Sequence, residues 1–149
     1  MPGTIWVGVL GVGRMGLPIA RALRTADIEV FAYDSDLSGE GAIREAGITP
    51  TSNADALAAG IDVLLTVLPD GESAHAGRGW ILALCAGALW IDLSSGDQRR
   101  SEPAMQAARA RGIRTVPAPM RGGPPEAASG DLDSSSAARK TTCARPSRS

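Results

Sequence analysis

The chain has 149 residues, 44% of them hydrophobic, and a formal net charge of -1 at pH 7. This size and apolar content suit one domain with a buried core, and the near-neutral charge excludes the strongly basic surface typical of nucleic-acid-binding proteins. No apolar run approaches the roughly 20 residues that a membrane-spanning helix needs, and the chain does not open with the basic segment of a signal peptide. We therefore expect a cytoplasmic protein with neither a nucleic-acid nor a membrane partner.

Hydrophobic periodicity predicts alternating strands and helices. The expected strands are short apolar runs, at residues 4–11, 28–34, 62–68, 88–93 and 113–119. The expected helices are amphipathic or capped segments, at residues 15–26, 38–47, 53–60, shortly after Gly79, and at 101–112. Asn53 is the expected N-cap of the third helix, and Gly47 and Gly60 are expected helix ends. This alternation is typical of an α/β fold, a doubly wound parallel sheet.

The turn between the first strand and the first helix has the pattern G-x-G-x-x-G, at Gly11, Gly13 and Gly16. In dinucleotide-binding domains the first glycine allows a tight turn, the second lets a pyrophosphate approach the backbone, and the third lets helix and strand pack closely. The helix N-terminus then offers free N–H groups to the phosphates. Because glycine turns also occur for steric reasons alone, a fold that binds nothing is the alternative.

Asp34 ends the second expected strand, about 20 residues after the glycine turn, as the fingerprint of a dinucleotide site requires. Its carboxylate would accept hydrogen bonds from the ribose 2'-hydroxyl of adenosine and repel a 2'-phosphate. Ser35 and Asp36 provide no arginine for such a phosphate. The sequence therefore favours NAD over NADP as cofactor, unless Asp34 is only a turn residue.

Four motifs in order make the chain resemble a known family. After the glycine turn come "TVLPD", "IDLSSGD" and "PAPMRGGPPEAASGDL". With these motifs, residues 4–132 resemble the β-hydroxyacid dehydrogenases, which include 3-hydroxyisobutyrate dehydrogenase, tartronate semialdehyde reductase and the NAD(P)-binding domain of 6-phosphogluconate dehydrogenase. The resemblance implies an oxidoreductase that moves hydride between NAD(P) and a small β-hydroxyacid or related carbonyl compound.

The resemblance also implies which residues form the site. Those expected at the cofactor are Gly11, Val12, Gly13, Arg14, Met15, Gly16, Asp34, Leu68, Pro69 and Ser95, the last of them on the nicotinamide side. Those expected at the substrate are Ser94, Arg121, Gly122 and Gly123. Arg121 replaces a small hydroxyl residue of the family, so it either binds a substrate carboxylate through a bidentate contact or points to solvent. We expect no metal, because the two cysteines lack a metal-site spacing and are expected as free thiols.

Family members continue with a long helix that carries a proton-transferring lysine, and with a helical second domain. Lys140 is the chain's only lysine and lies in a polar segment, so no catalytic residue is assigned. We expect a dinucleotide-binding domain at residues 1–132 and a disordered polar tail at residues 133–149. A GC-rich set of codons chosen for this tail gives, in a shifted frame, the Val-Gly-Gly turn of the family. Our hypothesis is a frameshifted, truncated dehydrogenase, and a native low-complexity terminus is the alternative.

Three functional interpretations follow. The first is the cofactor domain of such a dehydrogenase. We expect this chain to have little or no turnover, and we expect a small-molecule substrate only in the full-length relative. The second is a non-catalytic nucleotide-binding module, and the third is a fragment of an imine-reductase-like oxidoreductase. A missing second domain would leave apolar surface uncovered, so we also expect self-association.

Overall fold

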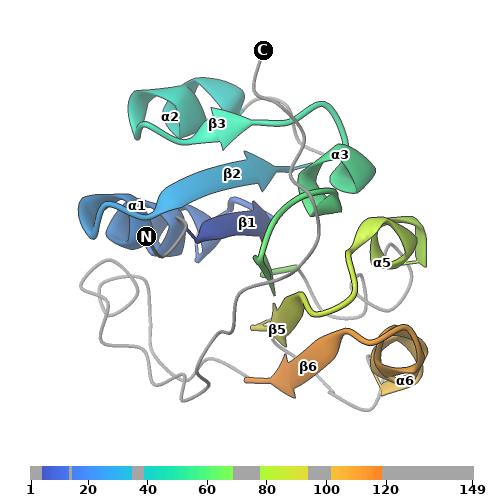
Figure 1. The fold of residues 1–149 in the computed structure, drawn as a ribbon. Helices are drawn as coiled ribbons and strands as arrows, with labels where there is room; N and C mark the ends of the chain where they lie inside the picture. Colours follow the sequence, from blue (N-terminus) through green and yellow to red (C-terminus); the bar gives the residue numbers. More distant parts are fainter. Residues whose placement is uncertain (1–4, 14, 35–38, 69–77, 94–101, 119–149) are drawn as a thin grey trace.

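The computed structural model describes residues 5–13, 15–34, 39–68, 78–93 and 102–118. Its centre is one sheet in which every pairing is parallel. The strands are β1 (Trp6–Leu10), β2 (Glu29–Tyr33), β3 (Thr49–Pro50), β4 (Val63–Thr66), β5 (Leu89–Asp92) and β6 (Arg114–Pro117). Their order in the sheet is β3-β2-β1-β4-β5-β6 (Figure 1). This order confirms the expected doubly wound α/β fold.

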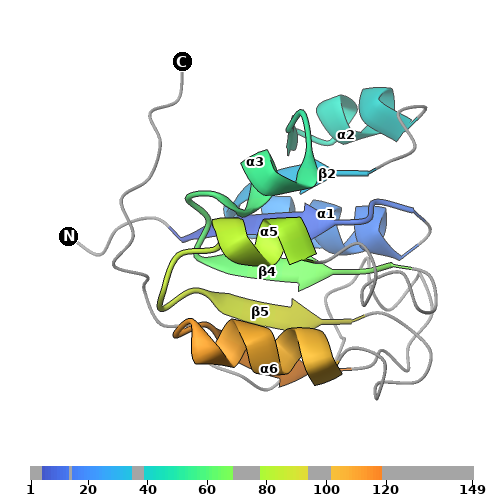
Figure 2. The same cartoon turned by 90° about the vertical axis from the view of Figure 1, so that its right-hand side faces the viewer.

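Helices cover both faces of the sheet. They are α1 (Gly16–Thr25), α2 (Glu40–Glu45), α3 (Ala54–Ala58), α5 (Arg78–Ala83) and α6 (Glu102–Ala110). Helices α1 and α2 lie on one face, and α3, α5 and α6 lie on the other (Figure 2). None of these described helices is long and apolar enough to cross a membrane.

Alternating side chains of the strands build a hydrophobic cluster on each face of the sheet. In β4, Val63 and Leu65 belong to the cluster under α1 and α2, whereas Leu64 belongs to the cluster under α3, α5 and α6. In the second cluster the indole rings of Trp80 and Trp90 meet edge to face, with ring centroids 4.9 Å apart. Burial of strand side chains on both faces explains why the strands are continuous apolar runs in the sequence.

The expected helix ends are confirmed. Gly47 and Gly60 adopt φ values of +80° and +91°, in the left-handed region that favours glycine. The Asn53 side chain accepts a hydrogen bond from the backbone N–H of Ala56, at 2.7 Å, as an N-cap residue does. These local signals were readable because each depends on one residue type and its immediate neighbours.

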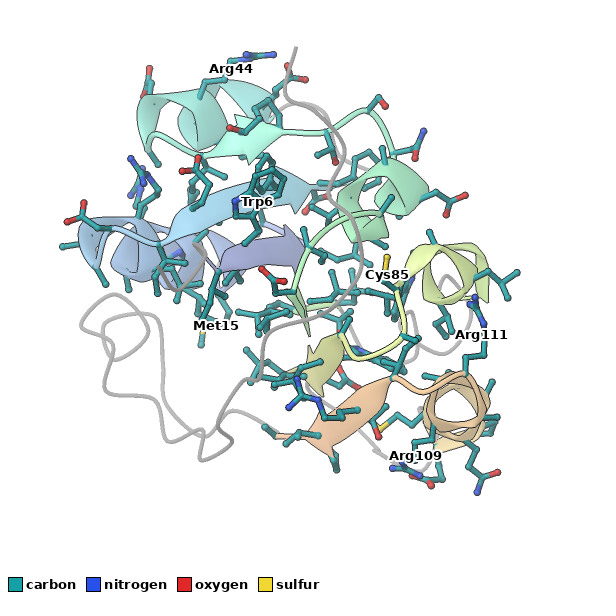
Figure 3. The ribbon with its side chains drawn as sticks, viewed as in Figure 1. Trp6, Met15, Arg44, Cys85, Arg109 and Arg111 are labelled. Carbon is teal, nitrogen blue, oxygen red and sulfur yellow. The ribbon has the colours of Figure 1, made fainter. Side chains whose placement is uncertain are left out.

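Four details differ from the expectations. Strand β3 was not expected; it has two residues, one of them Pro50, which is tolerated at an edge position. The first helix was expected to extend to residue 26, but α1 ends at Thr25 and Ala26 is its exposed C-cap. Strand β4 ends at Thr66 rather than next to Pro69. Cys85, labelled in Figure 3, is disulfide-bonded, so the expectation of a free thiol there is wrong.

Candidate functional site

The sheet order reverses between β1 and β4, which places a topological switch at their carboxyl ends. From β1 the chain proceeds outward through β2 to β3, and from β4 it proceeds the other way through β5 to β6. The backbone N–H of Val67 donates to the Leu10 carbonyl at 2.8 Å, so the two strand ends lie side by side. Open α/β sheets bind their ligands at this position.

Two of the three glycines at the switch are required by close backbone packing. A Cβ on Gly16 would overlap the carbonyl oxygen of Gly11, and a Cβ on Gly11 would overlap that of Val67. Gly11 also has a φ of +98°, which strongly favours glycine. The turn thus holds the start of α1 against the ends of β1 and β4.

Gly13 differs from its neighbours because nothing lies within 4 Å of where its Cβ would be. Packing within the described residues therefore gives no reason for glycine here, whereas close approach of a ligand to the backbone would. The first turn of α1 has no acidic residue and no side-chain cap at its N-cap residue, Met15. Figure 3 shows Met15 beside α1, on the α1 face of the sheet. The turn fits a pyrophosphate, which would find open backbone and the positive end of the helix dipole.

Asp34 lies at this turn, as its spacing predicted. Its Oδ2 accepts a hydrogen bond from the backbone N–H of Val12 at 2.7 Å. Next to it, the N–H of Gly11 donates to the Tyr33 carbonyl at 2.9 Å. The carboxylate at the end of β2 is thereby fixed beside the glycine turn, where a ribose hydroxyl next to a pyrophosphate would lie.

The second half of the switch holds a group of residues that were not among the expected site residues. At the carboxyl ends of β4 and β5, the Thr66 hydroxyl donates to Oδ1 of Asp92 at 2.9 Å, and the Trp90 indole N–H donates to the Thr66 hydroxyl at 2.9 Å. The signal that could have revealed them is an acidic residue that ends an apolar strand, in "LWID", as Asp34 follows one in "FAYD".

The structure thus brings together part of the expected site. The expected cofactor residues that it describes are Gly11, Val12, Gly13, Met15, Gly16, Asp34 and Leu68. The other expected site residues lie outside the described part of the chain: Arg14, Pro69, Ser94, Ser95, Arg121, Gly122 and Gly123. Their roles stay predictions.

Comparison with known proteins identifies one matching family and several relatives named as dehydrogenases. The family model for the NAD binding domain of 6-phosphogluconate dehydrogenase matches residues 6–146. The chain is 32% identical over 136 residues to 2-(hydroxymethyl)glutarate dehydrogenase of Eubacterium barkeri, covering 89% of this chain and 45% of the relative. It is 32% identical over 130 residues to 3-hydroxyisobutyrate dehydrogenase of Pseudomonas aeruginosa, covering 85% and 44%. The chain spans about half the length of the curated relatives it matches.

Solved structures with a similar fold include a 3-hydroxyisobutyrate dehydrogenase. The Mycobacterium tuberculosis 3-hydroxyisobutyrate dehydrogenase, solved with L-serine, has a TM-score of 0.81 and 26% identity, with 87% of this chain and 45% of that chain covered. Psf3 in complex with NADP+ and 2-OPP has a TM-score of 0.77 and 27% identity, over 85% and 46%. A reductive aminase from Aspergillus terreus, at 19% identity with 83% and 44% covered, shares the fold with a TM-score of 0.71.

These matches confirm the resemblance to β-hydroxyacid dehydrogenases and the expectation of an NAD(P) site. The family match extends over the glycine turn, Asp34 and the ends of β4 and β5, the parts from which the site is built. The chain belongs to the family of the NAD binding domain of 6-phosphogluconate dehydrogenase.

Proposed function

We propose that this chain is the cofactor-holding part of an NAD-dependent dehydrogenase that acts on a small β-hydroxyacid. The observation that carries the proposal is the contact between Asp34 and the glycine turn, a 2.7 Å hydrogen bond from the Val12 N–H to the carboxylate. This contact and the open backbone at Gly13 support a pyrophosphate site next to a ribose-binding acid. Relatives named as hydroxyacid dehydrogenases support the substrate class.

When bound, the nicotinamide would accept hydride from the carbinol carbon of the substrate, while the hydroxyl proton leaves to a base. The residues of this chain bind and orient the cofactor for that step. Gly13 would expose its backbone to the pyrophosphate, α1 would direct its N-terminus at the same group, and Asp34 would accept a hydrogen bond from the ribose. In this proposal Ser95 faces the nicotinamide and Ser94 and Arg121 face the substrate.

We also propose NAD rather than NADP as the preferred cofactor. A carboxylate at the end of β2 would repel a 2'-phosphate, and a phosphate site needs a cationic partner nearby. The first arginine after Asp34 is Arg44, on α2. Arg44 is ion-paired with Glu40 at 2.9 Å and its side chain is 65% exposed, and Figure 3 shows it at the outer side of α2.

The test is a titration of the purified chain with NADH and with NADPH, followed by nicotinamide fluorescence at fixed salt. We expect tighter binding of NADH. Asp34→Asn keeps an acceptor for the Val12 N–H but removes the charge, and should weaken NADH binding about tenfold and narrow the preference over NADPH. Asp34→Ala should weaken it further, because it also releases the turn.

Asp27→Asn is the matched control, since it removes the same charge at an exposed position with a φ of +62° that asparagine tolerates. It should leave both affinities unchanged. Equal or tighter binding of NADPH by the unchanged chain would overturn the cofactor preference. Absence of binding to either cofactor would overturn the proposed function.

A non-catalytic nucleotide-binding module is the second candidate, because it would use the same described residues to bind the nucleotide. The reductive aminase likeness supports the fold alone, so we do not extend it to imine chemistry. The expected domain boundary at residue 132 and the expected polar tail at residues 133–149 lie outside the described residues, so both stay predictions. The frameshift, self-association and a cytoplasmic location are parts of the proposal. The frameshift is tested by the nucleotide sequence after the Leu132 codon, where the alternate frame should encode a dehydrogenase-like continuation. Self-association is tested by size-exclusion chromatography at several concentrations.

A further inference from the structure

A buried chain of hydrogen bonds joins the carboxyl ends of two neighbouring strands. Thr66 ends β4, and Asp92 ends β5 directly opposite it in the parallel register. Thr66 and Trp90 are fully buried and Asp92 is 2% exposed. The bonds run from the Trp90 indole N–H to the Thr66 hydroxyl, and from that hydroxyl to Asp92 Oδ1, each 2.9 Å long.

The chemistry of the three groups fixes the direction of these bonds. An indole N–H can only donate, so the Thr66 oxygen accepts from Trp90. The hydroxyl hydrogen of Thr66 is then directed at the carboxylate, which can only accept when ionised. The Thr66 side chain is therefore held in one orientation by a donor on one side and an acceptor on the other.

We do not expect this network to add much to the free energy of unfolding. Placing a carboxylate in a buried environment is costly, and an apolar replacement of similar volume is often neutral or stabilising. A satisfied buried network instead specifies one geometry, because any shift of one member breaks the bonds of the others. Here the geometry that is specified is the relative position of the ends of β4 and β5. The backbone follows it, since the Leu93 N–H donates to the Thr66 carbonyl at 2.9 Å.

These strand ends belong to the second half of the dinucleotide site. Sheets of this order contain two mononucleotide-binding halves. The glycine turn and Asp34 occupy the half formed by β1 to β3, where adenosine and pyrophosphate are expected. The half formed by β4 to β6 therefore remains for the nicotinamide nucleotide, and Leu68 follows β4 at this edge.

We propose that Asp92 is a positioning residue: through Thr66 it fixes the ends of β4 and β5 in the arrangement that receives the nicotinamide half of the cofactor. The inference rests on the proposed function. It adds Asp92, Thr66 and Trp90 to the site without giving any of them contact with the cofactor. It requires that disturbing the network changes affinity for the nicotinamide half and leaves the adenosine half unaffected.

The experiment compares two ligands on the same variants by isothermal titration calorimetry. ADP-ribose reports on the adenosine half, and NADH reports on both halves. Thr66→Val keeps the volume and removes the hydroxyl, whereas Thr66→Ser keeps the hydroxyl. Asp92→Asn retains an acceptor for Thr66 without the charge. The midpoint of thermal unfolding is recorded for every variant, so that a loss of folded protein is seen separately.

We expect Thr66→Val to bind NADH about tenfold more weakly, as the loss of one well-placed hydrogen bond implies, and to bind ADP-ribose as the unchanged chain does. Asp92→Asn should also weaken NADH binding, but by a smaller factor. Thr66→Ser, which keeps the hydroxyl, should bind NADH as tightly as the unchanged chain does. If Thr66→Val weakens both ligands equally, or neither, the network is only structural and the proposal is overturned.

Failure of the proposed function would look different, because the unchanged chain would then bind neither ligand. If Thr66→Val does not fold, Trp90→Phe provides the same test, since it removes the indole N–H and keeps an aromatic ring against Trp80. If Trp90→Phe then has the same ratio of NADH affinity to ADP-ribose affinity as the unchanged chain, the proposal is overturned.

Discussion

Gly13 and Gly16 are two residues of one turn, yet their missing side chains have different physical consequences. A Cβ on Gly16 would overlap the Gly11 carbonyl oxygen, whereas a Cβ on Gly13 would meet nothing within 4 Å. Only the first position is thus required by the fold. In the proposed function, the second is required by the pyrophosphate that approaches the turn from outside.

We therefore expect Gly13→Ala to fold normally and to bind NADH at least about tenfold more weakly, since a methyl group would occupy space needed by the pyrophosphate. Gly16→Ala should lower the free energy of unfolding by several kcal/mol, because helix and strand backbones must separate. Thermal unfolding and NADH titration of both variants check this. A Gly13→Ala variant with unchanged NADH affinity would contradict the site.

Asp34 shows what a single residue's spacing can and cannot predict. Its place at the end of the second strand indicated a ribose-binding acid. That its carboxylate also holds the Val12 N–H could not be read, because the conformation of the turn determines which N–H groups face the strand end. Asp92 was missed for a similar reason, since its partner Thr66 is 26 residues away in sequence.

At the scale of single elements, α2 offers a test in which the same substitution has opposite effects. Gly41 lies within the helix with open space around its Cβ, and Gly47 follows the helix with a φ of +80°. Gly41→Ala should raise the free energy of unfolding by about 0.5 kcal/mol, because alanine loses less backbone entropy in a helix. Gly47→Ala should lower it by about 1 kcal/mol, because alanine resists that φ. Urea unfolding measures both, and equal signs would refute the assignment of the helix end.

The N-cap of α3 gives a second element-scale prediction. Asn53→Ala removes the acceptor of the Ala56 N–H and should lower the free energy of unfolding by about 1 kcal/mol. Asn53→Asp keeps an acceptor at the same place and is the control. Denaturant unfolding checks both variants, and NADH affinity should not change in either. A destabilisation shared by Asn53→Asp would point to a cause other than the cap.

Prediction from sequence was good for elements with strong local signals and poor at the sheet edge. Buried strands and capped helices were expected in the right order because periodicity and caps are local. Strand β3 was missed because two residues, Thr49 and Pro50, carry no periodicity. Its pairing with β2, at Phe31 opposite Thr49, exists only because the helices before and after it bring the chain there.

At the scale of the whole molecule, the proposed cofactor site includes no described residue to which we assign proton transfer. We therefore expect the purified chain to bind NADH and to form no NADH from NAD with 3-hydroxyisobutyrate or L-serine. Absorbance at the NADH band measures this, with a full-length 3-hydroxyisobutyrate dehydrogenase as positive control. Clear NADH formation would show that the chain itself completes the site.

The sequence by itself determined the fold class and the family, because each depends on residues close in sequence or on ordered motifs, and for the same reason it predicts the adenosine half of the site. The strand order agreed with expectation because parallel strands joined by helices have few allowed arrangements. Only the tertiary structure decided which residues meet across the sheet: Val12 with Asp34, and Trp90 and Asp92 with Thr66. Such pairs depend on register and turn conformation, which the packing of both helical layers sets and which no local pattern contains.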